Sequence, residues 1–255
     1  MFALSYKPFL FKQKVILISF LFLLFYCNSS KRPGQELLDK TIEYHDPEDR
    51  WSSLKAHLFL SSTDTAGQES PFEIEIDNAA GYFSHITRED GKEIVKGLSG
   101  GKEFYLINGK KEINEEERKK YELTPEGVKW VHSFYGYLYG LPMKLRDKGA
   151  IISDTTATET FHGKAYQTLK VTYEPGMGKE VWTFFLDPKT AAMEAYRFMF
   201  APGSDEGEYI LLNETLTVDG IKIPKVRKWH LVKESKYLGT DNLLKAETLK
   251  SHRIG

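Results

Sequence analysis

The sequence predicts a mainly β protein of the α+β type: a single curved antiparallel sheet or open half-barrel of about 10–11 strands, enclosing one aromatic-rich helix and preceded by a short N-terminal helix. Strand-length segments alternate apolar and polar residues, as Phe72 to Asp77 does, with Glu73, Glu75 and Asp77 expected on a solvated outer face. Turn signals such as Asp219-Gly220 join these segments as hairpins. No stretch alternates strands with helices, as a parallel sheet requires.

Two segments have helical periodicity and interrupt the strands. Gln35 to His45 is amphipathic. Gly127 to Leu145 is rich in aromatic residues, and we expect Thr124 to cap it, Pro125 to occupy its first turn, and Asn114 to cap a shorter turn ahead of it. Because the second segment is apolar around most of its girth, we expect it to be buried on most sides against the inner face of the sheet.

The first 27 residues have the features of a signal peptide. Lys7, Lys12 and Lys14 give a positive start without an acidic residue, and Val15 to Tyr26 is an unbroken apolar run. A membrane-spanning helix needs roughly 20 apolar residues, and this run is shorter. We therefore expect residues 1–27 to be separate from the folded domain.

The apolar run ends at Cys27, the only cysteine in the chain. The segment from Leu24 to Cys27 resembles the lipobox of bacterial lipoproteins, in which the cysteine becomes a lipidated N-terminus, although Tyr26 stands where that pattern has a small residue. Cleavage near Ser29 or Ser30, or an uncleaved anchor, is the alternative. Lipidation at Cys27 implies a cell-envelope protein on the periplasmic or surface face of a bacterial outer membrane. Residues 28–34 then form a tether and residues 35–255 a single folded domain.

Composition excludes several classes of function. A net charge of -1 gives no basic surface for nucleic acid, and 13% aromatic residues exclude a disordered chain. A single cysteine cannot form an intramolecular disulfide. The sequence has no P-loop, dinucleotide fingerprint, H-E-x-x-H motif or zinc spacing, so we expect no cofactor and no metal.

Three places carry catalytic residue types, and each has a simpler explanation. Ser99 lies in a G-x-S-x-G pattern, but a strand follows it where a nucleophile elbow needs a helix, so we expect a hairpin turn. His45 and Asp46 are expected to cap a helix end, with a protonated histidine complementing the helix dipole. His132 lies on the narrow polar strip of the aromatic segment, and we expect a buried, hydrogen-bonded side chain there. We assign no catalytic residue.

The aromatic residues remain unexplained by these motifs. They recur at alternate positions on successive strands, so that each pair shares a sheet face. Together with the rings of the helical segment, they either fill the core or line an apolar pocket. The candidate ligand-binding residues are Trp130, Phe134, Tyr135, Tyr137, Leu138, Trp182, Phe184, Tyr196, Phe198 and Tyr209.

Several segments carry a family resemblance: Tyr44–Pro47, Phe134–Leu145, Leu169–Tyr173, Gly207–Leu212, Asp219–Lys225 and Lys236–Asp241. They resemble an uncharacterised family of bacterial secreted lipoproteins, known only as a domain of unknown function. This resemblance implies no activity. The hairpins around residues 187–190 and 219–220 are similar to those of outer-membrane lipoprotein-sorting (LolA/LolB-like) carriers. That similarity implies an open half-barrel with helices in its mouth and a cavity for acyl chains.

We therefore expect a non-enzymatic, lipid-anchored envelope protein that binds an apolar ligand, such as an acyl chain, between sheet and helix. Its expected partners are the membrane, through the anchor, and a lipid or other apolar ligand, not nucleic acid. The alternatives are a structural or scaffolding lipoprotein whose own side chains fill the core, and a hydrolase-like enzyme that uses His132 or the pair His45 and Asp46. If rings of the helix hold the ligand, Trp130→Ala weakens ligand retention as well as stability.

Overall fold

A computed structural model describes residues 32–254, which lie in the second of two units of the chain, Lys31–Gly255. The predicted signal peptide, residues 1–27, the lipidation site Cys27 and residues 28–31 of the tether lie outside the described residues. Their assignment stays a prediction.

The helices of the described part are α1 (Pro33–His45), α2 (Glu115–Lys120) and α3 (Pro125–Gly140), with the short 3-10 helices η1 (Trp51–Ser53), η2 (Met143–Arg146) and η3 (Lys233–Ser235). Helix α1 begins two residues before its expected start, so Pro33 and Gly34 belong to the helix and not to the tether. Proline is suited to the first helical position. Gly34 lets α1 approach the sheet closely, because a Cβ atom there would lie 1.8 Å from the carbonyl oxygen of Ser153.

Residues 32–254 form one twelve-stranded antiparallel sheet in the order β5-β4-β3-β2-β1-β12-β11-β10-β9-β8-β7-β6. The strands are β1 (Lys55–Thr63), β2 (Glu69–Asp77), β3 (Tyr82–Glu89), β4 (Lys92–Ser99), β5 (Lys102–Ile107), β6 (Ala150–Phe161), β7 (Lys164–Tyr173), β8 (Val181–Leu186), β9 (Met193–Met199), β10 (Gly207–Val218), β11 (Ile221–Leu231) and β12 (Tyr237–Thr248). The predicted single curved antiparallel sheet is confirmed. The expected count of about 10–11 strands is too low, since residues 32–254 contain twelve paired strands.

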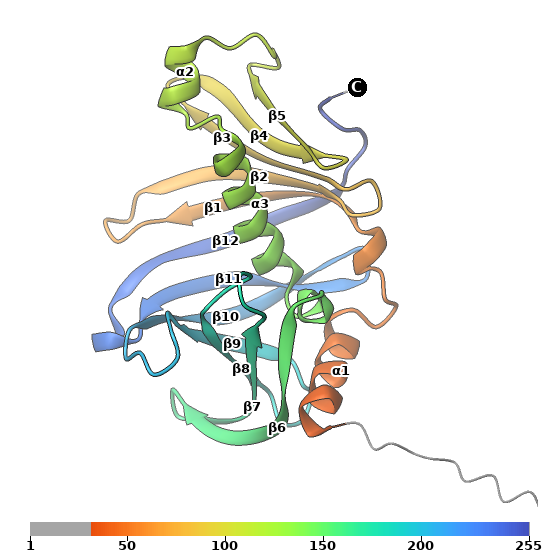
Figure 1. Ribbon diagram of the computed structural model, residues 1–255, viewed down its shortest axis with the longest axis vertical. Helices are drawn as coiled ribbons and strands as arrows, with labels where there is room; N and C mark the ends of the chain where they lie inside the picture. Colours follow the sequence, from red (N-terminus) through yellow and green to blue (C-terminus); the bar gives the residue numbers. More distant parts are fainter. Residues whose placement is uncertain (1–31, 255) are drawn as a thin grey trace, which may run out of the picture. The chain divides into compact units, whose positions relative to one another are not determined.

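The strand order places β5 and β6 at the two edges of the sheet, while β1 pairs with β12 at its centre. The chain must therefore cross from one edge to the other between β5 and β6. Helix α3 is part of that crossing and runs over the inner face of the sheet, where it contacts β3 and β4 (Figure 1). The position of the aromatic helix follows from this topology.

Both predicted N-terminal caps are present. The Asn114 side chain accepts a hydrogen bond from the Glu117 N–H at 2.9 Å, and Thr124 Oγ1 accepts one from the Gly127 N–H at 3.0 Å. Each bond satisfies a backbone donor that the first turn of a helix leaves free.

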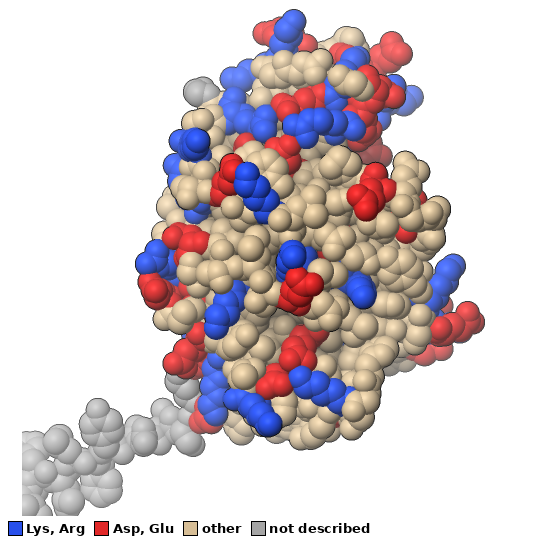
Figure 2. Space-filling model, turned by 180° about the vertical axis from the view of Figure 1, so that it is seen from behind, with Lys and Arg blue, Asp and Glu red and all other residues tan. Residues whose placement is uncertain are grey.

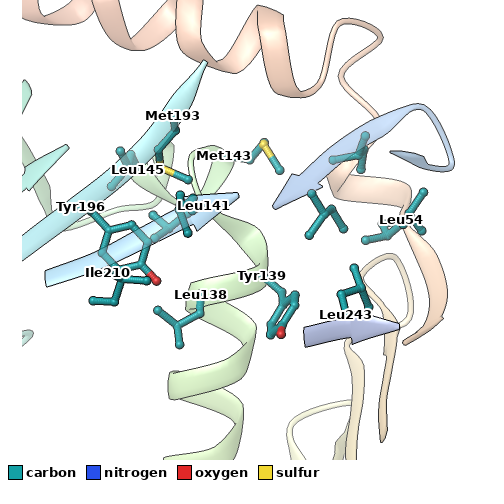
Figure 3. Packing of buried hydrophobic residues seen from close by; sticks show 14 of the residues in the cluster. Leu54, Leu138, Tyr139, Leu141, Met143, Leu145, Met193, Tyr196, Ile210 and Leu243 are labelled. Atoms are coloured by element: carbon teal, nitrogen blue, oxygen red, sulfur yellow. The ribbon is translucent and has the colours of Figure 1, made fainter. Parts of the chain in front are cut away.

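The main core lies between α3 and the inner face of the sheet. Figure 3 shows Leu138 and Tyr139, from the last turns of α3, among Tyr196, Ile210 and Leu243 from β9, β10 and β12. All five side chains are buried. Helix α3 is therefore held by the face that carries these residues and not around its whole circumference.

Helix α1 packs against β6, β7 and β11, and His45 at its C-terminal end fixes its position. The His45 ring is fully buried, with Nδ1 2.7 Å from the Lys222 carbonyl oxygen and Nε2 3.0 Å from the Met193 N–H that donates to it. Burial lowers the pKa of His45 to about 4. The expectation of a protonated histidine that complements the helix dipole is therefore wrong, and His45 is a neutral bridge between α1 and two strands. Asp46 is a cap, but of the next turn, since its carboxylate accepts the N–H groups of Arg50 and Trp51 at 2.8 Å.

The outer face of β2 is covered, which contradicts the expected solvated face of Glu73, Glu75 and Asp77. All three carboxylates are buried beneath the segment that follows β12. From that segment, Arg253 Nε donates to Glu75 at 2.9 Å, and His252 Nε2 lies 3.0 Å from Asp77. Figure 2 shows acidic and basic side chains intermixed at the upper end of this face. The alternation within β2 could not reveal this cover, because it comes from the other end of the chain.

Candidate functional site

A cleft of about 640 Å³ lies along one side of α3. Its walls come from α3, from β2, β3 and β4, from the segment 144–150, and from residues 173–182. Cavities that hold small ligands in proteins have about 300–1,000 Å³. The cleft is therefore large enough to enclose a small molecule or an alkyl chain.

The α3 wall of the cleft is the narrow strip of small or polar residues that the sequence shows. His132 and Ser133 each lie one turn before Gly136, and all three line the cleft. A Cβ atom added at Gly136 would meet only the His132 ring, at 3.7 Å or more. The cleft exists on this side because the helix presents little side-chain volume there.

The apolar part of the cleft is formed by aromatic rings and by a few aliphatic side chains. The Tyr137 and Trp182 rings meet edge to face, with centroids 5.2 Å apart. The hydroxyls of Tyr137 and Tyr173 are hydrogen-bonded to each other, and burial raises the pKa of Tyr137 well above its ordinary value. Ile76 and Phe83 line the wall contributed by the sheet. With the two hydroxyls paired, these rings present mainly apolar surface.

Charged side chains line the part of the cleft formed by the segment 144–150 and the loop after β7. Lys144 forms an ion pair with Asp147, and Lys148 and Glu180 are also lining residues. Among residues 32–254, no ion pair involves Lys148 or Glu180. The cleft thus combines an apolar interior with two cations and two anions.

The opposite side of α3 is filled by stacked rings. The Trp130 and Phe134 rings lie 5.1 Å apart at an interplanar angle of 9°, and Phe134 stacks on Trp229 of β11 at 5.7 Å. Trp130 is 60% exposed and borders a smaller pocket of about 170 Å³, separate from the main cleft. The prediction that α3 is buried on most sides is wrong at Trp130, because an open sheet covers only one face of a helix lying across it.

One family model covers most of this chain. The family model DUF6503, a family of unknown function, matches residues 12–246. The chain belongs to this family. The match confirms the predicted resemblance to an uncharacterised family.

Solved structures at low sequence identity share the fold of this DUF6503 protein. A putative outer membrane lipoprotein-sorting protein domain from Vibrio parahaemolyticus aligns with a TM-score of 0.51 at 9% identity, over 86% of this chain and 94% of that one. A LolA superfamily protein from Nitrosomonas europaea aligns with a TM-score of 0.49 at 10% identity, over the same shares of the two chains. No curated protein matches the chain. At 9% identity the likeness to the Vibrio parahaemolyticus domain shows a shared fold and nothing about the ligand.

In the DUF6503 chain, two of the ten predicted ligand-binding residues, Tyr137 and Trp182, line the cleft, and Phe198 stacks on Trp182 at 4.6 Å. Leu138, Phe184 and Tyr196 lie in the buried core, while Tyr135 packs between Phe72 and His85. Trp130 and Phe134 lie on the opposite side of α3 from the cleft.

Tyr209 lies on the other face of the sheet, which corrects its assignment to the ligand-binding side. Ile210 faces the inner core, so its neighbour Tyr209 points outward. There it stacks on His230 at 4.8 Å and meets Phe161 edge to face at 5.3 Å. Alternation fixes which residues share a face, but it does not say which of the two faces is the inner one.

Arg227 of β11 is buried beneath α3, and no pattern in the sequence singles it out. It is 1% exposed, lies 3.9 Å over the Tyr139 ring, and donates from Nη2 to the Leu138 carbonyl at 3.3 Å. That carbonyl is free because the residue four positions later, Pro142, has no N–H group. Arg227 therefore caps the end of α3 from the sheet. Arginine side chains are usually exposed, so the residue pattern of β11 does not predict that Arg227 is buried beneath a helix.

The residues considered as catalytic do not form an acid–base pair. Ser99 ends β4 in a hairpin, as expected, and Gly100 has a positive φ of 54°. His132 and Ser133 both line the cleft, but within residues 32–254 no hydrogen bond joins them. His132 is exposed and meets the Phe83 ring edge to face at 5.1 Å, so the expectation of a buried, hydrogen-bonded side chain is wrong. These two residues therefore do not form the hydrogen-bonded nucleophile and base that nucleophilic catalysis uses.

No group of three or more His, Cys, Asp or Glu side chains between residues 32 and 254 could hold a metal ion. In the same range, no helix has the length and apolar character needed to span a bilayer.

Proposed function

We propose that this protein is a lipid-anchored component of the bacterial cell envelope that binds the acyl chain of a lipid in the cleft beside α3. The observation that carries the proposal is the cleft itself: about 640 Å³ of open volume bordered by Tyr137, Trp182, Ile76 and Phe83. Each methylene group moved from water into such a site contributes about 0.8 kcal/mol. A long alkyl chain therefore supplies the affinity without a specific polar contact.

The anchor and the location rest on the N-terminal sequence. Cys27 follows an apolar segment of signal-peptide type, and lipidation there would keep the cleft near a bilayer. The family and the LolA-like fold are compatible with an envelope location. A mature N-terminus that begins after Cys27 and carries no lipid in mass spectrometry would refute the anchor.

The open volume beside α3 argues against the scaffolding alternative, in which the side chains of the protein fill the inner face. Within residues 32–254 no hydrogen bond joins His132 to Ser133, so the hydrolase alternative has no nucleophile and base pair to rest on. Of the three alternatives, acyl-chain binding is the one that assigns a role to the cleft.

The proposal is tested by closing the cleft without disturbing the core. Gly136→Leu places a branched side chain in open space on the cleft side of α3, and Gly136→Ala is the matched control. Both variants favour the helix, since glycine costs roughly 0.5–1 kcal/mol relative to alanine in a helix interior. Binding of a fluorescent fatty acid to the purified protein is then measured by titration.

We expect Gly136→Leu to weaken binding at least tenfold and Gly136→Ala to keep most of it. Trp130→Ala also retains binding, because Trp130 lies outside the cleft, which replaces the sequence-based expectation that it holds the ligand. Equal binding by the wild type and Gly136→Leu would contradict the proposal. So would the absence of fatty-acid binding and of co-purified lipid in the wild type.

A further inference from the structure

The volume of the cleft limits how many alkyl chains it can hold. At about 640 Å³ the cleft lies within the range of roughly 300–1,000 Å³ for pockets that take drug-sized ligands. An amphiphile with one alkyl chain is a ligand of that size, whereas a lipid with two or three long chains is larger.

The charges at the cleft indicate what kind of headgroup accompanies the chain. Lys144 and Asp147 neutralise each other in an ion pair, whereas Lys148 and Glu180 have no ion-pair partner within residues 32–254. Glu180 Oε2 accepts a hydrogen bond from the Lys179 N–H at 3.1 Å, so the Lys148 ammonium group and the other oxygen of the Glu180 carboxylate are left to meet a ligand. An anionic headgroup would be attracted by Lys148 and repelled by Glu180, while a headgroup with both signs can satisfy the two together.

We infer that the ligand is an amphiphile with one acyl chain and a zwitterionic headgroup, of the lysophosphatidylethanolamine class. This inference rests on the proposed function. The chain occupies the apolar interior beside Tyr137 and Trp182, and the phosphate and ammonium groups lie at Lys148 and Glu180. Exposed ion pairs are weak, so the chain supplies most of the affinity and the headgroup a preference of several-fold.

A competition experiment tests both parts. The purified protein is incubated with equimolar palmitoyl lysophosphatidylethanolamine, dipalmitoyl phosphatidylethanolamine and palmitic acid, then separated from free lipid, and the bound lipid is extracted and quantified by mass spectrometry. We expect about one mole of the lysolipid per mole of protein, at least tenfold more than of the two-chain lipid and several-fold more than of palmitic acid.

Two variants separate the roles of the charges without touching the core. Lys148→Gln should lower retention of both the lysolipid and palmitic acid. Glu180→Gln should lower retention of the lysolipid and raise that of palmitic acid, because the repulsion of the carboxylate is gone. Identical lipid profiles in both variants and the wild type would overturn the headgroup assignment.

The outcomes distinguish this inference from the proposed function. Equal recovery of the two-chain lipid, or of palmitic acid, would overturn the inference and leave acyl-chain binding in place. Recovery of none of the three lipids would overturn both.

Discussion

The two faces of the sheet are closed in different ways. The inner face is covered by α1 and α3, and a cleft of about 640 Å³ remains beside α3 (Figure 1). On the outer face, side chains cover the strands directly: Arg253 and His252 bind the carboxylates of β2, and Tyr209 packs among rings farther along the sheet. The outer face is covered locally by its own side chains, whereas the helices on the inner face leave an open cleft.

The difference follows from the geometry of the covering elements. Side chains on neighbouring strands lie about 4.5–5.5 Å apart and can fill a face locally. A helix is a rod about 10–12 Å wide, so one helix cannot fill the concavity of a curved twelve-stranded sheet. Open space remains wherever that helix carries small residues, as it does at Gly136.

The largest expected loss of stability is on the inner face, where α3 meets the sheet. Leu138 is 4% exposed, and Leu138→Ala should lower the free energy of unfolding by about 2–5 kcal/mol, because it leaves a cavity under α3. Urea denaturation measures this. Leu244→Ala, at a position 59% exposed on β12, is the control and should change stability by no more than about 0.5 kcal/mol. Equal losses in the two variants would mean that α3 is not held as described.

Lowering the pH should weaken the attachment of α1. His45 has a pKa of about 4 in the folded protein, and 6.5 is its ordinary value, so the unfolded chain binds the proton more strongly. The contribution of His45 is therefore complete above pH 6.5 and is lost as the pH falls to about 4, a change of about 3 kcal/mol. Denaturation at a series of pH values, compared with His45→Gln, isolates this effect. Parallel pH dependences in the two proteins would contradict it.

A smaller loss is expected on the outer face. Arg253 is paired with Glu75, which is 3% exposed, and Arg253→Gln should lower the free energy of unfolding by about 1–3 kcal/mol, since a buried carboxylate loses its cation. Arg253→Lys keeps the charge and should lose less. Urea denaturation of both variants checks this, and an unchanged midpoint for Arg253→Gln would show that the outer face does not depend on the pair.

Local residue patterns were enough to predict much of the fold. Alternation and hairpin turns gave the antiparallel sheet, and Asn114, Thr124 and Pro125 marked the helix starts correctly. The strip of His132, Ser133 and Gly136 was visible in the sequence, but we assigned the binding site to the aromatic residues beside it. The cleft lies on that strip, because open space follows from small side chains and not from large ones.

The sequence by itself determined the strand periodicity, the caps, the family and the apolar segment that ends at Cys27, because each of these depends on residues close together in the chain. Only the tertiary structure decided that Trp130 is exposed, that Tyr209 faces outward, and that Arg227 and Arg253 are partners of distant groups. These outcomes depend on which face of the sheet receives the single crossing helix and on which distant segment covers the other. Contacts between residues about a hundred positions apart leave no periodic trace in the sequence.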